Sequence, residues 1–131
     1  MSGVGRAIAD TSVFIARESG RPLDLDAMPD ELAISVVTVG ELRAGVLAAE
    51  DSSTRVRRLD TYRRALSLEP VPVDESIAES WAYLRVLLRE AGTRMAVNDS
   101  WIASTALALD LPLVTQDADY VDLKELRVIR V

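Results

Sequence analysis

The stretch VGRAIADTSVFIA, residues 4–16, places a single carboxylate between two apolar runs, and it decides the fold. The run from Ala7 to Asp10 is too short for a helix and predicts a buried strand. The residues after it, TSVFIARES, have apolar side chains at helical spacing behind small hydroxyl residues that favour a helix start. A strand that runs directly into a helix predicts the first part of an α/β fold, with Asp10 at the junction.

The same alternation of strands and helices continues along the chain. Strands are expected in LAISVV (32–37), less clearly in the proline-broken LEPVPV (68–73), and in PLVT (112–115) and LRVIRV (126–131). Helices are expected over 38–50, 52–67 and 74–92, and from Asn98 as N-cap. Such alternation predicts a parallel sheet covered on both faces, and we expect one domain over residues 1–131.

The composition fits a compact domain and removes several kinds of chemistry. Of 131 residues, 49% are apolar and 27% charged, which favours neither disorder nor a membrane protein. We expect a soluble, cytoplasmic protein. The chain has no histidine and no cysteine, so thiol nucleophiles, disulfides, imidazole catalysis and the usual zinc sites are excluded.

Acidic residues stand where the predicted strands end. Asp10 ends the first strand, Asp117 follows the PLVT strand by two residues, and Asp99 begins a helix. Glu41 lies one to two turns into the helix after the second strand. In an open parallel sheet the functional crevice lies beyond the carboxyl ends of the strands. We therefore expect these four acids to meet at one edge of the sheet.

Each acid also has an ordinary structural explanation. Asp10 and Asp99 stand where a side chain can cap a helix or interact with its dipole. Asp117 is typical of a turn, and Glu41 can face water beside Arg43. Helix capping does not explain why acids that follow three separate strands should lie at the same edge of the sheet. We therefore favour a shared site.

Carboxylates held close together need a counter-charge, and an all-oxygen ligand set favours Mg²⁺, with Mn²⁺ as substitute. Such an ion holds phosphate oxygens, activates water and stabilises a leaving oxygen. The sequence therefore predicts metal-assisted hydrolysis of phosphodiester bonds, with Asp10, Glu41, Asp99 and Asp117 as metal ligands and catalytic residues.

Three segments, read in order, resemble the successive motifs of the PIN domain in the form found in VapC-type toxins of bacterial toxin–antitoxin pairs. The segments are ADTSVFIA (9–16), TVGELRAGV (38–46) and VNDSWIASTALALDLPLVTQDADY (97–120), and the resemblance covers nearly the whole chain. It implies a three-layer α/β/α PIN-like fold.

The resemblance also assigns roles to individual residues. Asp10, Glu41 and Asp99 match the first three acids of the family, with hydroxyl residues next to the first. Asp117 matches the fourth acid, and Asp119 competes with it for that role.

The resemblance further implies an activity and partners. The activity is that of a Mg²⁺- or Mn²⁺-dependent endoribonuclease that cuts structured RNA such as tRNA or rRNA. The partner is a cognate VapB-type antitoxin, which restrains a homodimer within a larger complex that binds its own promoter.

The net charge of −6 argues against a polyanionic partner unless positive charge is concentrated locally. Residues 52–68 contain five arginines and one aspartate, and this helix could follow an RNA backbone. An ordinary solvated helix face explains the same pattern.

Three other functions compete with the nuclease. A phosphoacceptor receiver domain needs a pair of acids before its first helix and a lysine after a late strand, but the only lysine is Lys124 in a turn-rich tail. A haloacid-dehalogenase-like phosphatase needs a second Asp where this chain has Ser12. The remaining alternative is a non-catalytic binding scaffold whose acids are helix caps.

Overall fold

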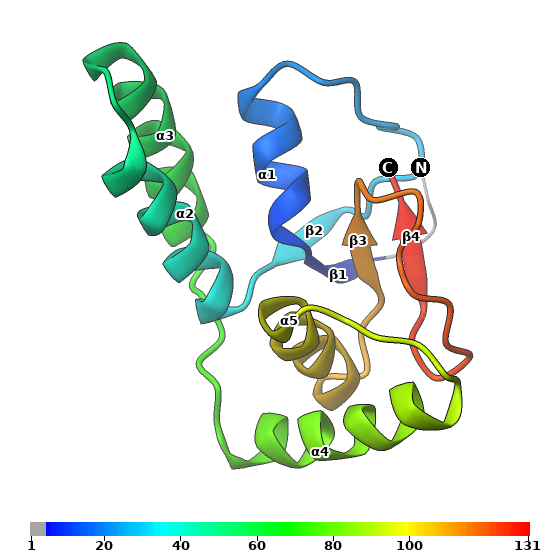
Figure 1. Ribbon diagram of the computed structural model, residues 1–131. Coiled ribbons are helices and arrows are strands. Elements are labelled where there is room, and N and C mark those ends of the chain that lie inside the picture. Colours follow the sequence, from blue (N-terminus) through cyan, green and yellow to red (C-terminus); the bar gives the residue numbers. More distant parts are fainter. Residues whose placement is uncertain (1–4) are drawn as a thin grey trace.

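The computed structural model describes residues 5–131, which form a parallel sheet with helices on both faces (Figure 1). The strands are β1 (Arg6–Ala9), β2 (Glu31–Ala33), β3 (Leu113–Thr115) and β4 (Val128–Arg130). The helices are α1 (Thr11–Glu18), α2 (Val36–Ala48), α3 (Ser52–Leu66), α4 (Glu75–Glu90) and α5 (Val97–Ala108).

The four strands are all parallel and lie in the order β2-β1-β3-β4. β1 and β3 are therefore the inner strands, with Ile8 opposite Leu113 in the register. The chain leaves β1 toward β2 on one side, while β3 lies on the other side of β1. Such a reversal of strand order is where ligands bind in α/β sheets, and Asp10 follows β1 at this point.

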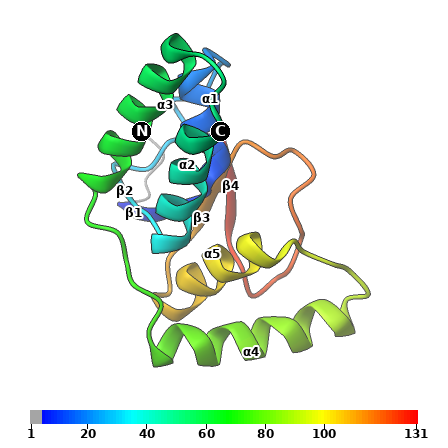
Figure 2. The ribbon, with the colours of Figure 1, turned by 60° about the vertical axis from the view of Figure 1, so that its left-hand side comes forward.

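The helices form two layers, as Figures 1 and 2 show from two directions. α4 and α5 cover one face, where Ile8 and Leu113 pack against the fully buried Leu84 and Ile102. On the other face Val13 of α1 packs with residues of β1 and β3. The antiparallel pair α2 and α3 stands beside α1 and buries a separate cluster. The three-layer α/β/α fold expected from the sequence is confirmed.

Two predicted strands differ from the structure. In LAISVV, Val36 and Val37 are helical, because the Ser35 side chain accepts a hydrogen bond from the Val37 amide (3.0 Å) and begins α2. In LEPVPV only Val71 pairs, through one isolated bridge to Ser35. The prolines around it lack the amide hydrogens that a longer ladder requires.

Within residues 5–131, no helix combines the length and the apolar character needed to cross a lipid bilayer.

Candidate active site

Asp10 lies at the carboxyl end of β1 with only 5% of its surface exposed. Its Oδ2 accepts hydrogen bonds from the hydroxyls of Ser12 (2.7 Å) and Thr115 (2.9 Å). Its amide donates to the Val114 carbonyl (2.8 Å). These contacts fix the carboxylate between the two inner strands. Oδ1 accepts no hydrogen bond from the described part of the chain and remains available to a ligand.

Glu41 reaches the same region from α2. Its Oε1 accepts a hydrogen bond from the Thr11 hydroxyl (2.7 Å), which lies 2.9 Å from the Thr38 hydroxyl. Its Oε2 lies 3.5 Å from the amide nitrogen of Asn98 on α5. Residues from α1, α2 and α5 thus meet around one carboxylate. Within residues 5–131 the side-chain partners of Glu41 are Thr11 and Asn98, and Arg43 forms no ion pair with it.

Asp99, the third residue of α5, is the strongest sign that the acids share one environment. The pKa of its carboxyl group is raised to about 6, first by burial and then by the charges of Asp10, Glu41 and Asp117 in that order. Like charges oppose ionisation only when they lie near one another. The structure therefore brings together the four acids that the sequence singled out.

Asp117 lies in the exposed turn after β3. Its amide donates to the Thr115 hydroxyl (3.1 Å), and its Oδ1 accepts from the Asp119 amide (2.9 Å). The charge of Asp117 acts on Asp99, whereas Asp119 is not among the causes of that pKa shift. The geometry thus favours Asp117 over Asp119 as the fourth acid of the cluster.

The four acids are close enough for their charges to affect one another, but they do not form a ready-made metal site. Within the described residues, no three acidic side chains are gathered tightly enough to hold an ion as they stand. The donors nevertheless fit a hard cation, because all are carboxylate oxygens and none of the four acids forms an ion pair in residues 5–131. A shared ion would require these side chains to draw together.

The family model described as the PIN domain matches residues 7–126. The chain belongs to the PIN domain family. Ribonuclease VapC5 of Mycobacterium tuberculosis is 49% identical over 116 residues, which cover 88% of this chain and 86% of that protein. Ribonuclease VapC4 of the same organism is 47% identical, and the match covers 98% of both chains.

A solved structure agrees with these relatives. The crystal structure of VapBC-5 from Mycobacterium tuberculosis, a member of the VapBC family of toxin–antitoxin systems, contains a chain that is 43% identical to this one. The TM-score is 0.87, and the match covers 97% of this chain and 99% of that one. The relatives therefore place this PIN domain among the VapC ribonucleases.

The sequence did not predict that two polar residues belong to this PIN domain site. Asn98 was expected to cap α5, but the helix begins at Val97 after Ala96, and Asn98 turns toward Glu41 instead. Thr38 was not predicted as a site residue. It lies three residues before Glu41 and therefore on the same face of α2, and this spacing was the signal available in the sequence.

Tyr120 is a third residue that sequence reasoning missed. The side chain packs among the core residues beneath α4 and α5 and is 7% exposed. Its hydroxyl is the only buried side-chain polar atom in the described residues that lacks a hydrogen-bond partner. Burial raises the pKa of this hydroxyl far above its ordinary value, and the charges of Asp10, Asp99 and Asp117 act in the same direction. The hydroxyl therefore stays protonated beside the acids.

Replacing Tyr120 with Phe is expected to stabilise the protein by about 1 kcal/mol, because the ring packing remains while an unpaired buried polar group is removed. Urea unfolding monitored by circular dichroism measures the change, and the slope of the transition should not differ from that of the unsubstituted protein. A clear loss of stability would show that the hydroxyl has a partner in solution.

Proposed function

We propose that this chain is a Mg²⁺- or Mn²⁺-dependent endoribonuclease that acts as the toxin of a toxin–antitoxin pair. The observation that supports it most directly is the gathering of carboxylates near Asp99, whose pKa is raised first by burial and then by the charges of Asp10, Glu41 and Asp117. Relatives that cover nearly the whole chain are named ribonucleases. Asp10, Glu41, Asp99 and Asp117 would hold the metal.

The residues of the chain have distinct tasks in this proposal. Ser12 and Thr115 occupy one oxygen of Asp10 and leave the other for a ligand. Thr11 orients Glu41 through a 2.7 Å hydrogen bond. When bound, a divalent ion at such a site polarises the phosphate and activates water for hydrolysis. A carboxylate-only site needs no histidine for this chemistry, which agrees with the composition.

Removal of divalent ions tests the proposal. EDTA is expected to reduce cleavage of cellular RNA to background, and added Mg²⁺ or Mn²⁺ should restore it, while the circular dichroism spectrum stays that of a folded protein. Sequencing the new RNA ends would identify the substrate. Undiminished cleavage in EDTA, or no cleavage with either ion, would contradict the proposed function.

The proposal includes a VapB-type antitoxin as partner, since the 43% identical chain comes from a structure described as a toxin–antitoxin system. A groove of about 560 Å³ beside α1 fits an apolar segment of such a partner. Leu25 at this groove is 74% exposed, and Phe14, Met28 and Leu32 line it with Arg17 and Arg21. By the same resemblance we propose a homodimer in the cytoplasm, within a larger toxin–antitoxin complex.

A further inference from the structure

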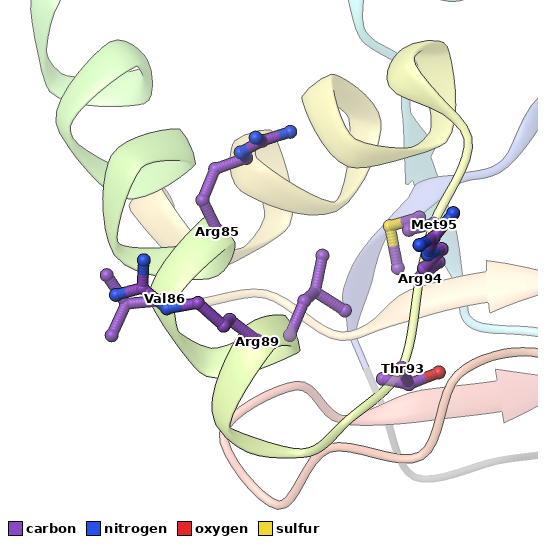
Figure 3. Close-up of a pocket in the computed structure, with 7 residues that line it drawn as sticks. Arg85, Val86, Arg89, Thr93, Arg94 and Met95 are labelled. Carbon is purple, nitrogen blue, oxygen red and sulfur yellow. The ribbon is translucent and has the colours of Figure 1, made fainter.

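Three arginines surround a pocket between the end of α4 and the segment that leads into α5 (Figure 3). The pocket has a volume of about 530 Å³. Arg85 and Arg89 line it from α4 and Arg94 lines it from the connecting segment, and Figure 3 shows the Arg89 side chain extending outward beside Val86. We call it the arginine pocket. Residues 85–95 contain these three arginines and a single acid, Glu90, so this segment carries a net charge of +2 in a chain whose total is −6.

The three guanidinium groups have no ionic or hydrogen-bonding partner within residues 5–131, and Arg85 lies over the Trp81 ring. Within residues 5–131 the ion pairs are Arg64–Asp60 and Arg127–Asp110, and neither involves the pocket. None of the three donates a hydrogen bond to the described residues. Other arginines of the chain do so, namely Arg55, Arg58, Arg64, Arg127 and Arg130. Unpaired guanidinium groups around one cavity are suited to anions, especially phosphates, which they bind in a forked geometry.

Rigid packing connects the pocket to the acidic site. The Arg85 guanidinium lies 5.2 Å from the centre of the Trp81 ring. Trp81 stacks on Trp101 of α5, with ring centres 4.7 Å apart, and its indole nitrogen donates to Ser100 (3.0 Å). Ser100 and Trp101 directly follow Asp99 in the first turns of α5. The position of the pocket relative to the acids is therefore set by packed aromatic rings.

The arginine-rich helix α3, which the sequence suggested as an RNA contact, is less suited to that task. Arg55 and Arg58 donate to the carbonyls of Ala49 and Gly45 and thereby hold the end of α2. Arg64 is bonded to Asp60. Three of the five arginines of α3 therefore already donate to partners, and only Arg57 and Arg63 have none within residues 5–131.

We propose that the arginine pocket binds the phosphate backbone of the RNA substrate next to the bond that is cut. This inference rests on the proposed function and adds the location of the substrate. Four clustered carboxylates repel a polyanion, so binding requires positive charge close to them. An RNA phosphate held at Asp99 has neighbouring phosphates along its strand. Arg85 of the pocket is connected to the helix that carries Asp99 through the stacked rings of Trp81 and Trp101.

The test replaces Arg85 and Arg89 together with Gln and measures binding of a short fluorescein-labelled single-stranded RNA by anisotropy in EDTA. We expect the dissociation constant to rise about tenfold near 0.1 M salt. The slope of log K against log salt should fall by about 1.4, since each lost contact to a single strand contributes about 0.7. The matched control replaces Arg57 and Arg63, two exposed arginines of α3, with Gln and should shift binding less than about twofold.

Several results would overturn the inference. Unchanged RNA binding by the α4 variant, or an equal loss in the α3 control, would show that the pocket has no special role. Retained RNA binding with loss of a co-purifying acidic protein would assign the pocket to a protein partner instead. The two proposals can also fail separately. If the α4 variant binds RNA more weakly but the unsubstituted protein cuts no RNA with Mg²⁺ or Mn²⁺, the proposed nuclease activity is contradicted and RNA binding by the pocket is supported. Circular dichroism confirms that each variant is folded.

Discussion

Replacement of Asp10 with Asn is expected to lower the rate of RNA cleavage at least about a hundredfold, since even the loss of an outer partner of a metal ligand costs 10–100-fold. Asn keeps the shape of the side chain, and its carbonyl oxygen can still accept from Ser12 and Thr115. The amide nitrogen then replaces the oxygen that faces the site. A donor stands where an acceptor is needed, so the substitution removes a ligand and leaves the packing intact. Gel analysis of RNA cleavage with Mg²⁺ measures the effect.

Asp110 provides the matched control. Asp110→Asn makes the same chemical change at the opposite edge of the sheet, just before β3, where the residue is fully exposed. Its backbone has a φ of +53°, which Asn tolerates well. Its only ion pair in the described residues, to Arg127, is long (3.9 Å) and exposed and contributes little. Cleavage by this variant should match that of the unsubstituted protein. If the protein is instead a non-catalytic scaffold whose acids cap helices, Asp10→Asn and Asp110→Asn should have equally little effect on RNA cleavage.

The sequence was sufficient to predict where the acids converge. Asp10, Asp99 and Asp117 follow or begin elements whose order is evident from apolar runs, and parallel strands place their carboxyl ends at one edge. Glu41 was predicted less directly, because its position depends on how α2 crosses that edge. The structure adds Thr11 as the residue that holds Glu41 toward the site.

The parts that could not be predicted depend on tertiary contacts. Val36 and Val37 have the β-branched side chains of a strand, but the Ser35 cap makes them helical, and Val37 packs against the core beneath α4 and α5. Asn98 is a favourable cap by type, yet a contact with Glu41, distant in sequence, determines its orientation. The unpaired hydroxyl of Tyr120 has no signature in sequence at all, because burial and partners are properties of the folded chain.

Asp99→Asn is expected to abolish cleavage and at the same time to stabilise the metal-free protein. The native pKa of Asp99 is about 6 and its ordinary value is 3.8, so the native state holds the proton more tightly than the unfolded state between these values. Stability therefore falls as the pH rises through this window, and the full cost is present above about pH 6. Asp99 is only partly buried, so solvent screening reduces this cost to about 1 kcal/mol. Asn has no charge and avoids it.

Thermal unfolding in EDTA at several pH values measures this difference. Near pH 7.5 the melting temperature of Asp99→Asn should exceed that of the unsubstituted protein by about 2–6 °C. The gap should shrink as the pH falls from about 6 and close below 3.8, where Asp99 is protonated in both the native and the unfolded state. With added Mg²⁺ the unsubstituted protein should have the higher melting temperature. An ion that binds the native state stabilises its four-acid site more than the three-acid site of Asp99→Asn. A gap that does not change with pH would show that Asp99 is not crowded by the other acids. Without that crowding, the electrostatic argument for a shared metal site fails even if the fold is correct.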